Sequence, residues 1–183
     1  MRRQLAILFF SALASSASAQ PREGGFEALA YASIQNVCIP LLRGQKRLGS
    51  LAEEQAFVAA QGLKTGISSD QLALFPPPHD STLSRATLIS GERNGSRFVL
   101  AIGGAEPSCR LFVEQRAGES RPAGDLAKLF SRADGWQPAN IPASATPRLG
   151  FVGGNPERPN AIALILLTNQ LPGIAYTAVI EAR

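Results

Sequence analysis

The sequence predicts an α+β fold: one domain with a mostly antiparallel sheet of about six strands, two N-terminal helices and one middle helix. Helix-like and strand-like segments come in blocks, without the regular β-α-β alternation of a parallel sheet. Arg93-Asn94-Gly95-Ser96 lies between two β-rich runs, and Asn-Gly in that position is a strong hairpin signal. Residues 161–168 are apolar on both faces, which predicts a strand in the middle of the sheet or in a subunit interface.

The composition excludes several classes of protein. The chain has 183 residues, a net charge of +4, 45% hydrophobic residues and 17% charged residues. This balance is typical of a packed domain and excludes a disordered charged tail. Because the basic residues after residue 19 are scattered singly, apart from the adjacent pair Lys46-Arg47, they do not form the basic stripe that nucleic-acid binding requires. We therefore expect no nucleic-acid partner.

The first nineteen residues have the pattern of an export signal. Arg2 and Arg3 precede an apolar run over residues 5–13, and Ala17-Ser18-Ala19 has the small-x-small form that signal peptidase accepts. We expect a cleaved signal peptide at 1–19, cut after Ala19, and a single α+β domain at 20–183. The apolar run is too short to span a bilayer, so no stable membrane anchor is expected. The predicted location is periplasmic or secreted.

Two helices are predicted before the first strands. From Phe26 onward, apolar or small residues recur at the spacing of one helix face. Pro40 lacks an amide donor, so this helix should stop or kink near Cys38 or Ile39. A capping-box pattern at residues 50–53 starts a second helix over 51–61, which Gly62 ends. A short helical turn is also predicted over 70–75, capped by Ser69 or Asp70.

Two three-stranded meanders account for most of the remaining chain. The middle helix should start near Asp125 and end at Gly135, between the two meanders, and an extended Pro-rich connector should follow over 137–147. The six expected strands share β-rich composition and flanking turn residues: 86–90, 97–102, 109–115, 149–152, 161–168 and 174–181.

Cys38 and Cys109 are the two cysteines, 71 residues apart. In an exported chain two cysteines allow one connectivity, so a structural disulfide is the preferred interpretation. Two buried free thiols or one reactive thiol are the alternatives. A redox or nucleophilic role is disfavoured because there is no C-x-x-C spacing.

Few residues are suited to familiar catalysis. His79 is the single histidine, and its neighbours Asp80 and Ser81 are adjacent in sequence, so the three side chains cannot converge as a triad. With one histidine and two cysteines we expect no metal site, and no glycine-rich motif predicts a cofactor. Aspartate and glutamate side chains are the remaining acid and base groups.

Trp136 follows the middle helix and is interpreted either as a core residue or as an exposed aromatic anchor for a partner. With the export signal, the cysteine-ending first helix and the Cys109-Arg110-Leu111-Phe112 strand, the layout resembles that of small exported proteins of Gram-negative bacteria.

The first functional hypothesis is a non-enzymatic domain of the cell envelope that binds a protein or envelope component through its sheet or its Pro-rich connector. The alternative is an envelope-polymer hydrolase that uses Asp and Glu side chains. The oligomeric state is left open by the sequence.

Overall fold

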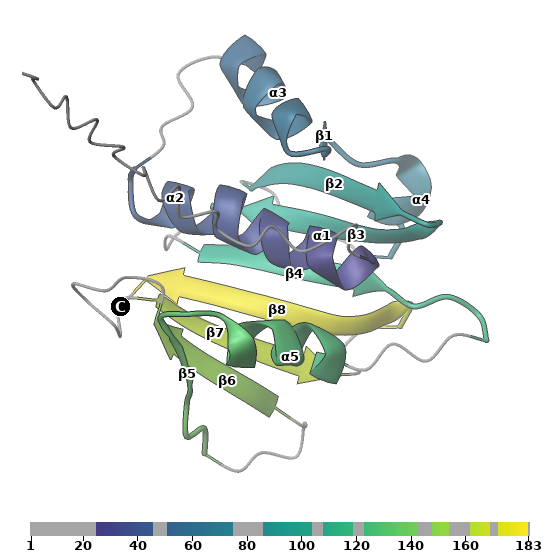
Figure 1. Cartoon of the computed structure of the whole chain (residues 1–183). Coiled ribbons are helices and arrows are strands. Elements are labelled where there is room, and N and C mark those ends of the chain that lie inside the picture. The colour runs from purple at the N-terminus through teal and green to yellow at the C-terminus, as the bar shows by residue number, and fades with distance from the viewer. Residues whose placement is uncertain are drawn as a thin grey trace, which may run out of the picture.

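A computed structural model describes residues 25–45, 51–74, 86–103, 108–118, 123–142, 148–153, 162–168 and 172–182. The predicted signal peptide, the predicted cap at Ser50 and the segment with His79 lie outside these residues. Within them the chain forms a single antiparallel sheet of eight strands with helices on both faces (Figure 1). The predicted α+β class is confirmed.

The strands follow the order β1-β2-β3-β4-β8-β7-β6-β5 across the sheet. Their bounds are as follows: β1 Lys64–Thr65, β2 Thr87–Arg93, β3 Ser96–Ile102, β4 Ser108–Glu114, β5 Trp136–Pro138, β6 Arg148–Gly153, β7 Ile162–Thr168 and β8 Ile174–Ala182. Strands β2-β3-β4 and β6-β7-β8 are the two predicted meanders, and antiparallel pairing of β4 with β8 joins them.

The expected count of about six strands was too low, because two short strands complete the edges. Lys64–Thr65 pairs with β2, and Trp136–Pro138 pairs with β6 at the start of the segment predicted as an extended connector. Strands of two and three residues are too short to show a period of two in the sequence. They form because a long neighbouring strand offers free backbone groups.

The β2–β3 hairpin forms where the Asn-Gly signal predicted it. Asn94 has a φ of 52° and Gly95 a φ of 71°, and two consecutive residues with positive φ are the signature of a type I′ turn. Arg93 pairs with Ser96 directly across the turn. The register of both strands is therefore fixed by this dipeptide.

The helix layout also differs in detail from the prediction. The helices are α1 Phe26–Ser33, a π-helical turn η1 Ile34–Cys38, α2 Ile39–Leu42, α3 Leu51–Ala60, α4 Ser69–Leu72 and α5 Ala123–Arg132.

The short α4 follows Ser68, whose amide donates to the side chain of Gln71. The N-cap residue is thus Ser68, one position before Ser69 and two before Asp70, the two caps that the sequence offered.

The first helix does not stop near Cys38 or Ile39, one of the two outcomes predicted from Pro40. Instead it widens to a π-helical turn, in which the amide of Ile39 donates to the carbonyl of Ile34. Pro40 then occupies the first turn of α2, where the helix requires no amide donor. The chain remains helical to Leu42 because the change of hydrogen-bonding pattern places the proline where its missing N–H costs little.

The middle helix ends three residues before the predicted Gly135. Beyond Arg132 the amide of Ala133 donates to Phe130, and the amide of Trp136 donates to Ala133. Gly135 has a φ of 80° and turns the chain from α5 into β5. Gly135 is therefore the residue of the reversal and not the last residue of the helix.

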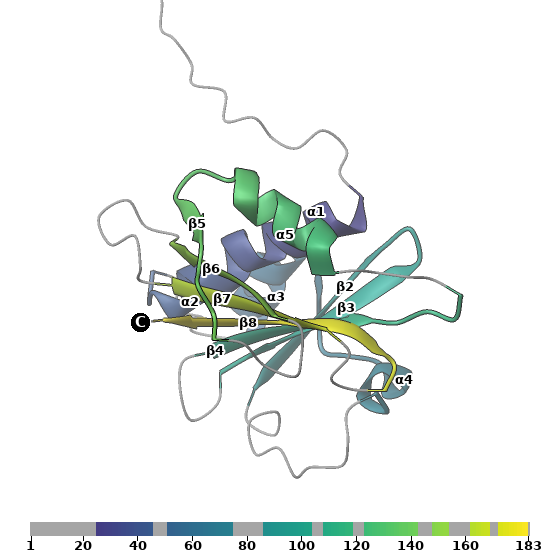
Figure 2. The same cartoon turned by 90° about the horizontal axis from the view of Figure 1, so that it is seen from below.

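The sheet has helices on both faces but one main core. Viewed along the sheet in Figure 2, α1 and α5 lie on one side and α4 on the other. The main core fills the space under α1, η1 and α5, with alternate residues of the long strands pointing into it. Strand β7 contributes Ile162, Leu164 and Leu166, all fully buried. The strand predicted to be central therefore lies between β6 and β8.

Phe130 of α5 holds the aromatic part of this core together. Its ring centroid lies 4.9 Å from that of Tyr31 on α1, 4.9 Å from that of Trp136 on β5 and 5.9 Å from that of Phe151 on β6. Aromatic pairs in such tilted and edge-to-face arrangements contribute about 0.5–1.5 kcal/mol each beyond the area they bury. One fully buried residue thus joins both helices to the β5–β6 end of the sheet.

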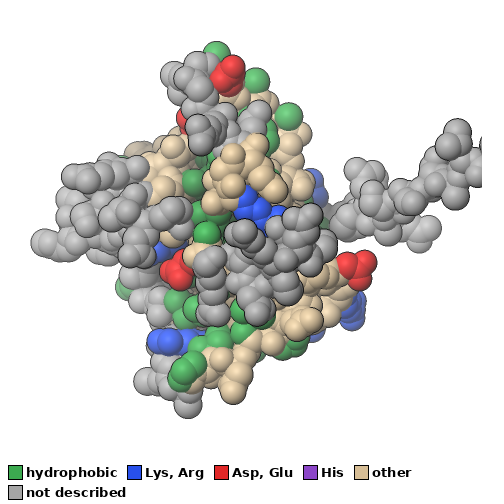
Figure 3. All heavy atoms as spheres, turned by 90° about the vertical axis from the view of Figure 1, so that its left-hand side faces the viewer, with side chains coloured by type: hydrophobic (Ala, Val, Ile, Leu, Met, Phe, Trp, Pro, Cys, Tyr) green, Lys and Arg blue, Asp and Glu red, His purple; other side chains and the backbone are tan. Residues whose placement is uncertain are grey.

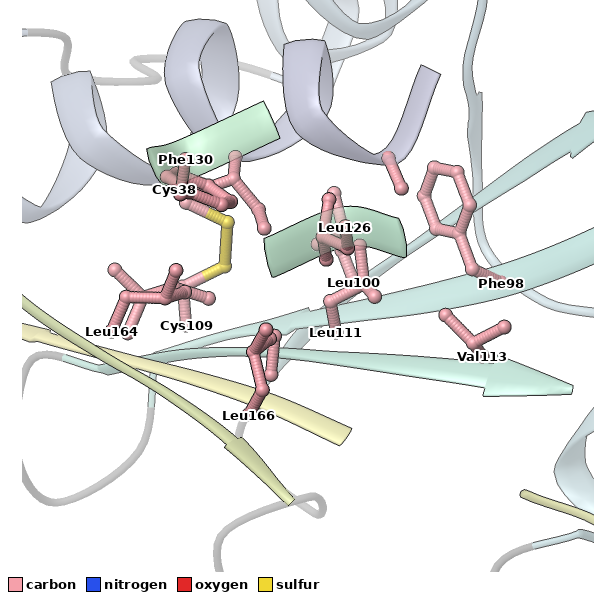
Figure 4. Close-up of a cluster of buried hydrophobic side chains, with 14 of the residues drawn as sticks. Cys38, Phe98, Leu100, Cys109, Leu111, Val113, Leu126, Phe130, Leu164 and Leu166 are labelled. Atoms are coloured by element: carbon pink, nitrogen blue, oxygen red, sulfur yellow. A yellow bond between two sulfur atoms is a disulfide. The ribbon is translucent and has the colours of Figure 1, made fainter. Parts of the chain in front are cut away.

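The predicted disulfide is confirmed. Cys38 in the π-helical turn is bonded to Cys109 of β4, and both residues are fully buried. Figure 4 shows the bond passing from the helix to the sheet among Phe130, Leu164 and other core side chains. The bond attaches the helical layer to one of the two central strands. Among the described residues no helix is long and apolar enough to cross a membrane.

Reduction of the Cys38–Cys109 disulfide should lower the free energy of unfolding by about 4 kcal/mol, the chain-entropy estimate for a loop of this length. Urea unfolding of oxidised and reduced protein measures the difference. Equal midpoints in the two states would contradict the assignment. Intact-mass measurement before and after reduction is the control.

Gly91→Ala should destabilise the protein by about 1–3 kcal/mol because a Cβ atom there would lie 2.2 Å from Cζ of the buried Phe98 ring. Gly124→Ala is the matched control, since a Cβ at this position of α5 meets nothing within 4 Å. It should stabilise by up to about 1 kcal/mol through higher helix propensity. Thermal unfolding of both variants tests the contrast, which would be refuted by equal shifts.

Candidate functional site

The structure pairs the two cysteines and buries the tryptophan that the sequence singled out. Trp136 is 7% exposed and packs edge-to-face on Phe130. A side chain covered in this way offers a partner little contact area, so the geometry favours the core interpretation of Trp136 over the exposed anchor. Trp136 also begins the edge strand β5, which borders an apolar groove between α5 and the β5–β6 pair.

A charge network that the sequence did not reveal ties α4 to the outer face of the sheet. Arg97 of β3 donates from Nε to Oε2 of Glu114 at 2.8 Å and from Nη1 to Oδ2 of Asp70 at 2.7 Å. Its Nη2 also lies 2.8 Å from Glu114 Oε2. Gln71 Nε2 donates to the other oxygen of Glu114 at 2.9 Å. The network therefore joins α4, β3 and β4.

Glu114 is the deeply placed member of this network. Its side chain is 8% exposed, whereas those of Arg97 and Asp70 are 34% and 59% exposed. A buried carboxylate is tolerated only when it is paired and hydrogen-bonded, and Arg97 and Gln71 supply both conditions. Glu114 lies at a β-bulge, where the register with β8 shifts between Val113 and Glu114.

The exposed carboxylate of the network is held in its charged form. A hydrogen bond from the Ser68 hydroxyl, and then one from Arg97, lower the pKa of Asp70 from its ordinary value of 3.8 to about 2. Arg97 in turn has a raised pKa, mainly because of its hydrogen bond to Asp70. Asp70 thus remains an anion at neutral pH and is a hydrogen-bond acceptor there.

A polar cleft of about 750 Å³ opens beside this network. It lies between residues 62–71 on one side and the β2–β3 hairpin on the other. Its charged lining residues are Lys64, Asp70, Glu92, Arg93 and Arg97. Ile67 is the only large hydrophobic side chain that lines it within the described part of the chain.

An apolar groove of about 510 Å³ lies toward the opposite edge of the sheet, between α5 and the β5–β6 pair. Leu149, 46% exposed, lines it together with Phe151 and Ile141. Two basic residues also line it: Lys128 of α5, which pairs with Asp125 at 2.7 Å, and the exposed Arg148 of β6. Figure 3, which faces the left-hand side of Figure 1, shows hydrophobic and charged side chains interspersed over the described surface.

Neither site could be derived from sequence spacing. Asp70 and Arg97 are 27 residues apart, and Gln71 and Glu114 are 43 residues apart, so the sheet topology alone brings them together. Across the described residues, no group of three or more His, Cys, Asp or Glu side chains is arranged to hold a metal ion.

Comparison with known proteins gives one partial similarity. The chain is 33% identical over 102 residues to phosphoribomutase of Saccharomyces cerevisiae, a match that covers 52% of this chain and 16% of that protein. The chain thus matches about a sixth of the length of this relative. No protein-family model matches the sequence, and no solved structure matches it.

Arg97→Met should destabilise the protein by about 3 kcal/mol because it leaves the Glu114 carboxylate buried without its cation. Lys128→Met is the matched control: it removes the cation of an exposed pair on α5 and should cost no more than about 0.5 kcal/mol. Chemical denaturation measures both. A loss of similar size in the two variants would show that Arg97 has no special structural role.

Ser68→Ala should raise the pKa of Asp70 from about 2 toward 3.8, since the Ser68 hydrogen bond is the largest cause of its lowering. Because the pKa is lower in the folded than in the unfolded state, the stability linked to Asp70 is present above about pH 4 and is lost as pH falls through about 2. Carboxyl NMR titration follows Asp70, with Asp125 as control. An unchanged Asp70 titration in the variant would contradict this assignment.

Proposed function

We propose that this chain is an exported, non-enzymatic binding domain of the bacterial cell envelope, and that the groove between α5 and β6 contacts its partner. The observation that carries the proposal is the apolar groove beside the sheet edge, where Leu149 remains 46% exposed. A large aliphatic side chain exposed in a concave apolar site is typical of a contact surface. The confirmed disulfide supports an oxidising compartment.

Charge indicates the chemistry of the partner. Arg148 has no ion-pair partner among the described residues, and Lys128 has Asp125 on its own helix. A partner segment with an apolar side chain for the groove and an acidic side chain beside it would satisfy both features. We therefore propose a protein segment of this composition as the occupant.

The hydrolase alternative has less support. Asp70 and Glu114 do converge on one point, as a hydrolase would require, but that point is the guanidinium of Arg97. A catalytic general acid needs a raised pKa, whereas the pKa of Asp70 is lowered to about 2. The partial similarity to phosphoribomutase carries no activity to this chain, because it covers 16% of that protein.

Site-specific photocrosslinking in the periplasm tests the proposed groove. A photoreactive residue at position 149 should give a discrete protein adduct, and Arg148→Glu should reduce its yield at least about tenfold by reversing the complementary charge. Position 72 is the matched control, because Leu72 of α4 is 58% exposed but lies outside the groove.

Mapping of the adduct decides the outcome. A crosslinked segment with acidic residues next to an apolar residue supports the proposal. Equal adducts from positions 149 and 72, or an adduct at 149 that is insensitive to Arg148→Glu, would overturn it.

A further inference from the structure

The polar cleft at the β1–β2 edge has the properties of a ligand site separate from the proposed partner groove. Its volume of about 750 Å³ falls within the range of about 300–1,000 Å³ typical of small-molecule sites. Unlike most such sites, it is lined almost entirely by polar side chains and glycine. Its occupant must therefore be recognised by hydrogen bonds and not by burial of apolar surface.

Charged side chains of both signs line the described part of the cleft. Lys64, Arg93 and Arg97 are positive, and Asp70 and Glu92 are negative; Glu114, which is not a lining residue, pairs with Arg97. A ligand with one net charge would meet groups of both signs, so neither an anion nor a cation matches the whole of this lining. A hydroxyl group can donate to a carboxylate and accept from a guanidinium or ammonium group, so a neutral ligand with many hydroxyls can use both kinds of residue.

The polar groups on the floor of the cleft are held in place before any ligand binds. Arg97 is fixed by both Asp70 and Glu114, and Gln71 is fixed by Glu114 and the Ser68 amide. Fixed side chains lose little conformational entropy when they bind a ligand. Asp70 nevertheless remains 59% exposed, so its carboxylate is accessible from the cleft.

Glycines leave open space on the cleft walls. At Gly62 and Gly66 the space that a Cβ would occupy has no atom within 4 Å, and both residues have positive φ. Their amides donate to the backbone carbonyls of Ala59 and Leu88, so the two glycines give a ligand room to approach but no free N–H group.

We propose that this cleft binds a short neutral saccharide. The inference is independent of the proposed protein partner, whose groove lies toward the other edge of the sheet. It rests on the cleft volume, the lining side chains of both charges, the fixed Arg97 network and the open space at Gly62 and Gly66.

NMR titration of ¹⁵N-labelled protein tests the proposal, because four glycines line the cleft and glycine amides are easily identified. Chitotriose and maltotriose are the neutral probes, and inorganic phosphate and putrescine are the charged probes. At least one saccharide should shift the amides of Gly66 and Gly95 in a saturable way. The amides of Gly124 and Gly150, which line the other groove, should not move.

Asp70→Asn should weaken saccharide binding about tenfold, the loss expected for one charge-assisted hydrogen bond. Asp125→Asn, at an exposed carboxylate on α5, is the matched control and should bind like the unchanged protein. If Asp70→Asn does not fold, Glu92→Gln at the same cleft takes its place with the same expectation.

The proposal is overturned if neither saccharide moves the cleft glycines, or if phosphate or putrescine moves them at lower concentration than the saccharides do. It is also overturned if the Asp125→Asn and Asp70→Asn variants lose affinity equally. None of these outcomes bears on the crosslink from position 149, so failure of this proposal can be distinguished from failure of the proposed partner groove.

Discussion

The pairing of β4 with β8 is the contact on which the rest of the structure depends. Each meander forms from neighbouring segments, and among the described strands the β4–β8 ladder, from Ser108–Glu181 to Glu114–Ile174, is the pairing that joins the two meanders. It creates a sheet wide enough for α1 and α5 to lie side by side on one face, where Tyr31 and Phe130 meet at 4.9 Å. The disulfide adds a covalent connection from the helical layer to β4. The β4–β8 pair thus joins the two halves of the sheet, and the disulfide stabilises the attachment of the helical layer to β4.

The same strand pair separates two surfaces with different chemistry. Toward the β1–β2 edge, Arg97 forms ion pairs with Glu114, at the bulge of the β4–β8 ladder, and with Asp70 of α4. These ion pairs hold α4 against the outer face and border the polar cleft. At the β5–β6 edge, α5 stands over Leu149 and Phe151 and leaves an apolar groove with basic residues beside it. A partner protein and a small polar ligand could therefore contact the domain without competing for the same residues.

Strong local signals allowed much of the fold to be predicted from the sequence. Asn94-Gly95 predicted the hairpin, the helical spacing after Phe26 predicted the first helix, and the two cysteines predicted the disulfide.

The errors arose where tertiary contacts decide the local structure. The π-helical turn placed Pro40 in a tolerated position, and β1 and β5 exist only because β2 and β6 lie beside them. The Arg97 network was not predictable for the same reason, since neither Asp70 nor Glu114 has a spacing that points to the other. For Trp136 the sequence left a core position and an exposed anchor open, and the side chain lies in the core, while the exposed leucine of the neighbouring groove carried no sequence signal.

The two short edge strands limit how another chain can approach this sheet. A long free strand edge would offer a row of unpaired amides and carbonyls to any extended segment, including one from another copy of the protein. Here one edge consists of two residues, and the other includes Pro138, which has no amide to donate. An approaching strand would therefore find few backbone groups on β1 or β5 with which to extend the ladder. Recognition at the proposed groove relies on side chains, so its specificity can change by substitution at positions such as Arg148 and Leu149 while the backbone framework of the domain stays the same.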